Sequence, residues 1–502
     1  MTNPSGTNLS KRSEGASPRL RDEPRNQPLT LRTIESLPGP PGLPWLGSAL
    51  QMSPQQLHLQ LERWAQQYGR FYRVHAAGMK FLVVNDYALA QQILKERPDG
   101  YRRVRKMEPV AQDLMMNGLF SSEGERWKNQ RRIWLATLNA QQLKSFHEKL
   151  LATTKKLLAR WQAAADRGDA VDVASDLMRY TVDVTMQFAL GHEANTLEKG
   201  EDVIQRHLDK IFPALGRRVR GFFPYWRYFK LPQDRELDRA LSALRIEVGA
   251  LIDQARERLR TNPKLRESPS CFLEALLLAN EADGAAISDD DVFANTMTVL
   301  LGGEDTTANT MAWLIHCVSD RSDVYAALRQ EADALLDAAG VPDADVPRAD
   351  RFPHLLRMTD ATINETLRLH PVAPMFFLEA LRDTAMADLA VPGGTNVLLL
   401  TRAAANSSPH STPSPVFDPL KEAGAADSAP GRAASLPFGY GPRMCPGRNL
   451  ALAELRSATL MLARNFDIEA VPMAEPVTEV FSFTLVPRNL RVRFHRRPRT
   501  LQ

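Results

Sequence analysis

The sequence predicts a mainly α fold with small β-sheets, and two observations carry that prediction. Four long segments place apolar residues at three- and four-residue intervals, which is typical of amphipathic helices: 141–166, 171–190, 234–261 and 270–282. Strand-like runs are few, with a hairpin pattern early in the chain and two runs late in it: 71–86, 396–401 and 483–494. Helices and strands are thus segregated and do not alternate as βαβ units.

The composition suits one large globular body. Of the 502 residues, 44% are hydrophobic and 24% are charged, which provides a sizeable core. The 63 basic and 59 acidic residues nearly cancel, so the strongly basic field that nucleic acid requires is missing and no nucleic-acid partner is expected. No run approaches the roughly 18 consecutive apolar residues of a membrane span, so none is predicted.

Three regions are expected along the chain. Residues 1–36 are rich in Ser, Pro, Asn and mixed charge, which predicts a disordered polar tail. A stiff, proline-rich stretch begins at Leu37. The globular domain is expected over 37–496, with a short tail at 497–502.

The chain has 3 cysteines, which are widely spaced and form no CxxC pair. Neither a disulfide framework nor a zinc site is therefore expected, and a cytoplasmic location is the simplest one. Cys271 and Cys317 are interpreted as small buried hydrophobic residues.

Cys445 has different surroundings, in the stretch "FGYGPRMCPGR". Glycines let backbone amides turn toward the sulfur, Pro446 suits the first turn of a helix, and Arg443 and Arg448 supply positive charge. These features favour a thiolate, which is the form that binds metals or attacks substrates. A nucleophile would need a histidine base, and none lies nearby in the sequence. A metal or haem ligand needs only the thiolate.

A second unusual stretch, "GGEDTT", occupies 302–307 within an apolar helical segment that a capping box at Ser288 and Asp291 opens. Two glycines weaken a helix by about 1 kcal/mol each, and acids and hydroxyls are expensive to bury. A threonine hydroxyl can instead bond back to a carbonyl and open the helix locally. The combination predicts a binding notch.

The spacing of five residues around Cys445 resembles the haem-binding loop of the cytochrome P450 family. By that resemblance Cys445 is the axial iron ligand, Phe438 packs beside the sulfur and Arg443 pairs with a haem propionate. Gly441 and Gly447 shape the loop. A thiolate ligand donates electron density that favours cleavage of the O–O bond.

Two further motifs extend the resemblance. "GGEDTT" is similar to the family's oxygen-activation motif, in which Asp305 and Thr306 would deliver protons. Gly302 and Gly303 would then make room beside the haem, although the family more commonly has Ala at the first of these positions. Trp127, with an Arg four residues later, resembles a segment in which both residues reach a propionate.

The arginine four residues after Trp127 is Arg131. Glu365 and Arg368 resemble the family's structural ion pair, which an Arg usually completes. Lys421 stands at that place here, and the sequence leaves open whether it completes the network, since Lys lacks the planar fork of Arg.

The resemblance implies a single large cytochrome P450-type haem domain with haem (heme) b, iron-protoporphyrin IX, as cofactor and O2 as co-substrate. The expected enzyme is a monooxygenase that inserts one oxygen atom into a hydrophobic small molecule by hydroxylation or epoxidation. Its pocket would come from 108–120, 293–303, 372–377 and around Thr484 and Leu485. Electrons would come from a separate ferredoxin or flavodoxin with an NAD(P)H reductase, docking near Lys128, Arg131, Arg132 and Arg448.

A soluble, monomeric, bacterial-type enzyme of secondary metabolism is the form we expect. Two alternatives remain: a peroxide-driven haem-thiolate peroxygenase, and a non-catalytic haem sensor with a thiolate ligand. Asp305 and Thr306 argue against both. The substrate, its regioselectivity and the choice among hydroxylation, epoxidation, desaturation and coupling cannot be separated from sequence.

Overall fold

The computed structural model describes residues 31–76, 78–221, 223–284, 286–341, 344–405, 416–424 and 435–498. Residues 1–30 of the tail expected over 1–36 lie outside the described residues. Residues 499–502 of the tail expected over 497–502 also lie outside them. Residues 31–36 differ from the expectation. Ile34–Ser36 form a short 3-10 helix, and the Arg32 side chain forms an ion pair of 2.7 Å with Asp388. Residues 31–36 therefore contact the domain that is expected to begin at Leu37.

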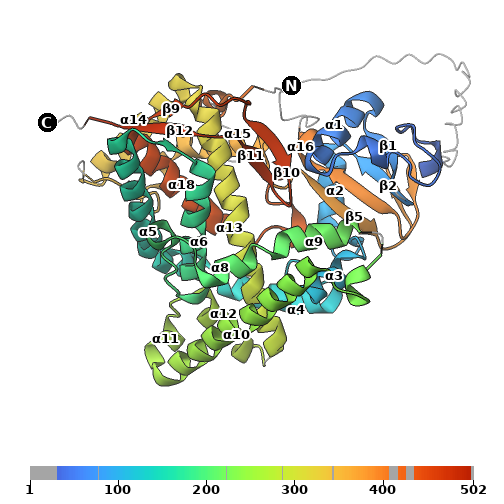
Figure 1. Cartoon of the computed structure of the whole chain (residues 1–502), viewed down its shortest axis with the longest axis horizontal. Helices are drawn as coiled ribbons and strands as arrows, with labels where there is room; N and C mark the ends of the chain where they lie inside the picture. Colours follow the sequence, from blue (N-terminus) through green and yellow to red (C-terminus); the bar gives the residue numbers. More distant parts are fainter. Residues whose placement is uncertain are drawn as a thin grey trace, which may run out of the picture.

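Helices dominate the described chain (Figure 1). Those of the first half are α1 (Leu57–Tyr68), α2 (Tyr87–Lys95), α3 (Met107–Asp113), α4 (Gly124–Thr137), α5 (Ala140–Arg167), α6 (Val173–Leu190), α7 (Thr196–Lys199), α8 (Val203–Leu208), α9 (Ile211–Arg220) and α10 (Pro232–Thr261). Those of the second half are α11 (Pro263–Glu267), α12 (Phe272–Ala282), α13 (Asp289–Ser319), α14 (Ser322–Ala338), α15 (Arg357–Leu369), α16 (Thr401–Ala405), α17 (Pro419–Gly424) and α18 (Arg448–Asn465). The four long predicted helices are confirmed as α5, α6, α10 and α12.

The largest sheet has 5 strands in the order β1-β2-β8-β5-β3. Its members are β1 (Phe71–Ala76), β2 (Met79–Val84), β8 (Asn396–Leu400), β5 (Met375–Ala380) and β3 (Tyr101–Arg103). The predicted hairpin is confirmed, since β1 and β2 pair antiparallel. β2 pairs parallel with β8, although more than 300 residues separate them in sequence.

Three smaller sheets complete the β structure: β4-β12-β9, β6-β7 and β10-β11. Their strands are β4 (Ala170–Val171), β6 (Thr384–Met386), β7 (Leu389–Val391), β9 (Phe466–Ala470), β10 (Thr478–Phe481), β11 (Leu485–Arg488) and β12 (Val492–Arg496). The predicted strand run 483–494 is confirmed as β11 and β12. Most of the others are too short to show a period of two, so the sequence analysis missed them.

The centre of the molecule is α13, drawn in yellow in Figure 1. It packs against α6 over much of its length and also contacts α18, α15 and α14. Its N-terminus has the predicted capping box: the Asp291 N–H donates to Ser288 Oγ over 3.2 Å, and the Ser288 N–H donates to Asp291 Oδ2 over 3.2 Å. A long buried helix is therefore fixed where the sheets and the other helices meet.

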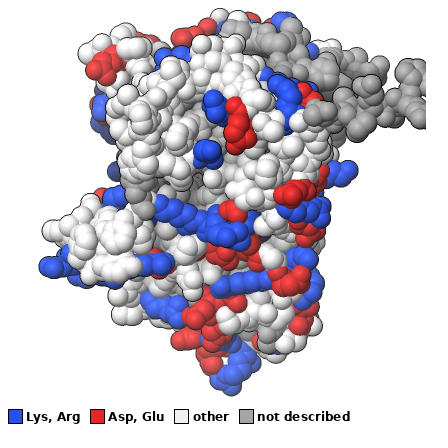
Figure 2. Space-filling view, turned by 90° about the vertical axis from the view of Figure 1, so that its right-hand side faces the viewer, with Lys and Arg blue, Asp and Glu red and all other residues white. Residues whose placement is uncertain are grey.

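Figure 2 shows the end of the molecule that lies at the right of Figure 1. Acidic and basic side chains intermingle on the lower part of this face, while the upper part carries few charges. Within the described ranges, no helix combines the length and the apolar character needed to cross a bilayer.

Candidate functional site

Cys445 lies three residues before the last large helix, α18, and Gly447 is the N-cap of that helix. Burial among protein atoms raises the pKa of the Cys445 thiol. Backbone N–H groups of Gly447 and Arg448 and the charge of Arg131 act in the opposite direction and favour the thiolate. The side chain is nevertheless open to solvent. A thiol that many protein atoms surround and that is still accessible can receive a ligand.

The loop before Cys445 is held by backbone contacts. The Cys445 N–H donates to the Phe438 carbonyl over 2.9 Å. Gly441 has φ +71°, and a Cβ there would lie 2.7 Å from the Leu94 carbonyl oxygen at the end of α2. Gly441 therefore docks the loop on α2, whereas a Cβ on Gly447 would lie 3.9 Å from Cys445 Sγ. Gly447, but not Gly441, borders the sulfur.

Arg443 is the most constrained charge near this loop, with its side chain only 4% exposed. It forms an ion pair with Glu123, and its guanidinium lies 4.3 Å from the centre of the Trp127 ring. Its Nε and Nη1 atoms are buried without a hydrogen-bond partner among the described residues. Burial and the neighbouring arginines lower the pKa of Arg443 to about 10, against the opposing effect of Glu123. The site thus presents unsatisfied donors to a missing acceptor.

Two further arginines join this cluster, and sequence reasoning missed both. Arg97 is 3% exposed, and its Nε and Nη2 atoms also lack a partner within the described ranges. Arg103 donates from Nε to the Phe120 carbonyl over 2.7 Å. Their positions in the sequence form no motif, so only the fold could reveal them.

We call Arg97, Arg103, Arg131 and Arg443 the arginine cluster. Glu123 is the carboxylate whose charge acts on three of them. Buried guanidinium groups with free donors favour a ligand that carries more than one negative charge. The two propionates of a haem satisfy that requirement, and the thiol of Cys445 satisfies the requirement for an axial ligand.

The notch predicted in the middle of α13 depends on the surroundings of its two glycines. A Cβ on Gly302 would have no atom within 4 Å, whereas one on Gly303 would lie 2.5 Å from Thr185 Oγ1 on α6. Gly302 therefore faces open space, whereas the absence of a side chain at Gly303 permits close packing of α13 on α6. Thr306 Oγ1 donates to the Gly302 carbonyl over 2.8 Å, which is the back-bond that the sequence predicted.

Asp305 stands beside Thr306 in a desolvated position. Burial, with a smaller contribution from the charge of Asp209, raises the pKa of Asp305 to about 6. An acid with a pKa in this range can both hold and release a proton near neutral pH. Asp305 and Thr306 are thus suited to the proton transfer expected of them.

Aromatic side chains from three parts of the chain contact one another and include one from an expected pocket segment. The Phe483 ring stacks on the Phe212 ring at 4.3 Å and lies 6.1 Å from the Phe120 ring. Asn295 of α13 accepts the Leu119 N–H over 2.9 Å. The expected pocket segments 108–120 and 293–303 are therefore adjacent, and Phe212 is an addition that the sequence analysis did not include.

The supporting ion pair is formed without Lys421. Arg368 bonds both carboxylate oxygens of Glu365, at 2.7 and 2.9 Å. Lys421 is 78% exposed and pairs with Asp418 at 3.0 Å. The Asp418 backbone N–H, rather than a side chain, donates to Glu365 over 3.1 Å. The open question about Lys421 is therefore answered: it does not complete the network.

The basic residues expected to receive a redox partner are partly engaged. Lys128 pairs with Glu125 at 2.8 Å, and Arg132 pairs with Asp283 at 2.5 Å. Arg448 is exposed close to Cys445, with its guanidinium 5.8 Å from the centre of the Phe438 ring.

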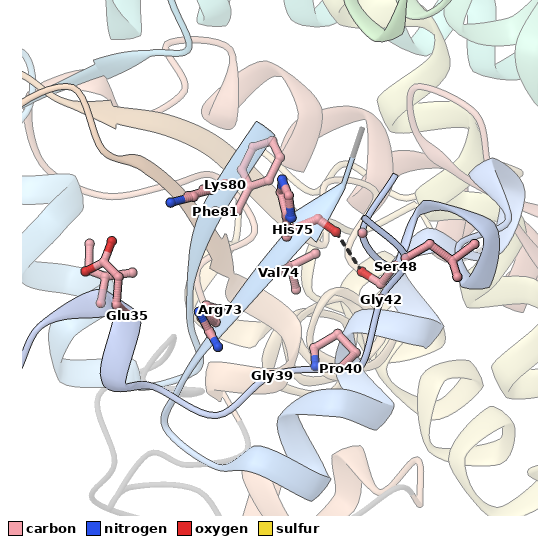
Figure 3. Close-up of a pocket in the computed structure, with 13 residues that line it drawn as sticks. Glu35, Gly39, Pro40, Gly42, Ser48, Arg73, Val74, His75, Lys80 and Phe81 are labelled. Atoms are coloured by element: carbon pink, nitrogen blue, oxygen red, sulfur yellow. Dashed lines mark hydrogen bonds between the residues drawn. The ribbon is translucent and has the colours of Figure 1, made fainter. Parts of the chain in front are cut away.

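A separate cavity of about 210 Å³ lies at the β1–β2 end of the molecule (Figure 3). Glu35, Arg73, His75 and Lys80 line it, and Ser48 Oγ donates to the His75 carbonyl over 3.1 Å. None of the residues around Cys445 or in the notch of α13 contributes to its wall. This cavity therefore has no part in the chemistry of the site.

These features together suit a haem-thiolate protein. They are a thiol before a helix N-terminus, a buried arginine cluster, and a glycine that faces open space in a central helix. Comparison with known families agrees: the family model described as "Cytochrome P450" matches residues 37–494. The chain belongs to the cytochrome P450 family, whose members are haem-thiolate monooxygenases that use O2, redox partners and hydrophobic substrates.

Several relatives are similar at low identity. Human cytochrome P450 4F8 is 26% identical over 363 residues, which cover 70% of this chain and 69% of that protein. Carotene epsilon-monooxygenase, a chloroplastic protein of Arabidopsis thaliana, is 24% identical over 437 residues, covering 83% of this chain and 78% of that protein. The crystal structure of the cytochrome P450 CYP102L1 superposes with a TM-score of 0.78 at 24% identity and covers 92% of this chain and 99% of its own. This likeness confirms the fold, including the predicted class.

Proposed function

We propose that this chain is a monooxygenase that inserts one oxygen atom of O2 into a hydrophobic small molecule, with electrons from a separate protein. The observation that carries the proposal is Cys445, a buried but accessible thiol that faces two backbone N–H groups and the charge of Arg131. These N–H groups and this charge favour the thiolate against the effect of burial, and a thiolate is the form that would bind haem iron.

The proposed cofactor is haem b. Arg443 and Arg97 would bind its propionates through donors that are otherwise unsatisfied, with Trp127 and Arg131 beside them. When bound, the haem supplies the chemistry of dioxygen activation. The protein holds the group in place, and Gly302 leaves space at the notch.

Proton delivery is assigned to Asp305 and Thr306. The pKa of Asp305, raised to about 6, allows this carboxyl group to hold a proton in the apolar interior and release it near neutral pH. Thr306 donates to the Gly302 carbonyl at rest, and its hydroxyl can rotate toward a ligand in the notch.

The substrate is proposed to be hydrophobic because Phe120, Phe212 and Phe483 form an aromatic group that includes a residue of the expected pocket segment 108–120. Hydroxylation and epoxidation are both compatible with such a pocket. One relative is named for carotene monooxygenation, which makes long apolar hydrocarbons a sensible part of any screen.

We further propose a monomer in the cytoplasm that acts in secondary metabolism and receives electrons from a ferredoxin or flavodoxin with its NAD(P)H reductase. Arg448 is exposed close to Cys445, and its positive charge supports docking of an acidic electron-transfer protein on the surface near Cys445. All 3 cysteines are free thiols, as a reducing compartment favours.

The test follows the absorption spectrum of the purified haem-bound protein. After reduction and exposure to carbon monoxide, the wild-type protein should show the spectrum of a thiolate ligand, and Cys445→Ser should lose it while Cys271→Ser retains it. A screen of hydrophobic compounds should then find ligands that displace the iron-bound water. A Cys445→Ser spectrum identical to wild type would refute the ligand assignment.

The same preparation discriminates the alternative functions. Oxidation of a hit compound with NADPH and a ferredoxin–reductase pair supports the monooxygenase. Oxidation with peroxide alone would instead indicate the peroxygenase, and ligand binding with neither activity would indicate a sensor.

A further inference from the structure

Behind the notch, a group of carboxylic acids connects α13 with α8. Glu304 of α13 is 4% exposed, and its carboxyl is a neighbour of the Gln205 side chain of α8. The same Gln205 side chain donates from Nε2 to Asp209 Oδ1 over 2.7 Å. Asp209 is exposed, and its charge acts on both Glu304 and Asp305. We call Asp209, Glu304 and Asp305 the acid cluster.

The acid cluster lacks compensating positive charge. Among the described residues, none of its three carboxyl groups forms an ion pair, and each has its pKa raised by burial and by neighbouring acids. Carboxyl groups in such an arrangement cannot all be ionised together, so they share protons.

Unsatisfied atoms favour a proton on Glu304. Glu304 Oε1 and Gln205 Oε1 are both buried acceptors without a hydrogen-bond partner in the described part of the chain. An ionised Glu304 would leave a charge buried beside unpaired acceptors, which is costly. A protonated Glu304 carries no buried charge and has a donor of its own to offer.

We propose that Glu304 is a protonated reserve acid that restores a proton to Asp305 after Asp305 has delivered one to the notch. The inference rests on the proposed role of Asp305. In the transfer, the O–H bond of Glu304 breaks and an O–H bond forms on the Asp305 carboxylate. Asp209 then takes a proton from solvent and returns it to Glu304. No electrons move, and Gln205 is a positioning residue that holds the two acids together.

Glu304→Gln keeps the shape of the side chain and removes its exchangeable acid proton. The matched control is Glu454→Gln on α18, because Glu454 is 1% exposed and likewise has a buried oxygen without a partner in the described chain. Both variants are prepared as haem-bound proteins and compared with wild type.

The first measurement is infrared difference spectroscopy of the resting protein at pH 7, in H2O and in D2O. A protonated carboxyl band that shifts in D2O should disappear in Glu304→Gln, while Glu454→Gln should leave that band in place. This readout is independent of turnover. Persistence of every such band in Glu304→Gln would overturn the proposal.

The second measurement uses NADPH, a ferredoxin with its reductase, and O2 without added substrate. Reduction of O2 to peroxide consumes two electrons and two protons, and reduction to water consumes four of each. Glu304→Gln should slow the formation of water about tenfold, less than the 10²-fold or more that a directly acting acid contributes. The peroxide share should rise accordingly, and Glu454→Gln should match wild type.

Asp305→Asn separates this inference from the proposed function. If Asp305→Asn raises the peroxide share and Glu304→Gln does not, the reserve role is wrong and the role of Asp305 stands. If neither variant changes the share, the role of Asp305 is wrong as well.

Discussion

Adjacent glycines in α13 should respond in opposite ways to the same substitution. In Gly303→Ala, the new Cβ would lie 2.5 Å from Thr185 Oγ1 and 2.9 Å from Thr185 Cγ2, well inside contact distance. Overpacking of this kind costs about 1–3 kcal/mol. In Gly302→Ala no atom lies within 4 Å of the new methyl group, so the helix propensity of Ala should add about 1 kcal/mol of stability.

Urea unfolding of the haem-bound proteins, followed by fluorescence, measures both effects. We expect the two variants to differ by about 2–4 kcal/mol in the free energy of unfolding. The double variant Gly303→Ala/Thr185→Ala should recover most of the loss, because the clashing atoms are removed, and the cycle isolates their interaction. Equal stability of Gly302→Ala and Gly303→Ala, or no recovery in the double variant, would refute this account of the packing between α6 and α13.

Three further predictions concern the site and its support. Arg443→Leu should weaken haem binding by about 1.5–3 kcal/mol, which is the contribution of hydrogen bonds to a charged group. Transfer of haem to apomyoglobin measures this loss. Haem retention equal to that of wild type would exclude a contact between Arg443 and a propionate. The pKa of Asp305 is raised from 3.8 to about 6, so the free energy of unfolding falls as pH rises through that interval. Asp305→Asn should therefore recover up to about 3 kcal/mol of stability at pH 7. Parallel pH profiles of unfolding for the variant and the wild type would contradict the raised pKa. Glu365→Gln removes the carboxylate charge that pairs with buried Arg368 and should lower the free energy of unfolding by about 3–5 kcal/mol. Lys421→Ala should stay within about 0.5 kcal/mol of wild type in the same unfolding assay.

The site was predictable where its chemistry is local in sequence. The residues from Phe438 to Gly447 form one turn and the start of one helix, so glycines, cations and a cysteine at fixed offsets indicate a thiolate site before any folding is considered. The same is true of Thr306, whose bond to the Gly302 carbonyl spans one turn of a helix. Local spacing alone therefore predicted the ligand loop and the notch.

The parts of the site that depend on distant contacts were not predictable. Arg97 and Arg103 join Arg443 from more than 300 positions away, and no period or motif relates them. Gly303 was placed in the notch because its neighbour belongs there, but its role depends on Thr185 of another helix. The sequence also could not show that the backbone of Asp418 takes the place that was open for Lys421.

The sequence by itself determined the helical class, the hairpin, the capping of α13 and the thiolate loop, because each depends on neighbours within a few residues or on a short period. Tertiary structure alone decided which charges are buried together, which glycine faces open space and which acids share protons. Burial and charge proximity are properties of surfaces brought together by folding, and they set the pKa values and the unsatisfied donors on which the chemistry of the site depends.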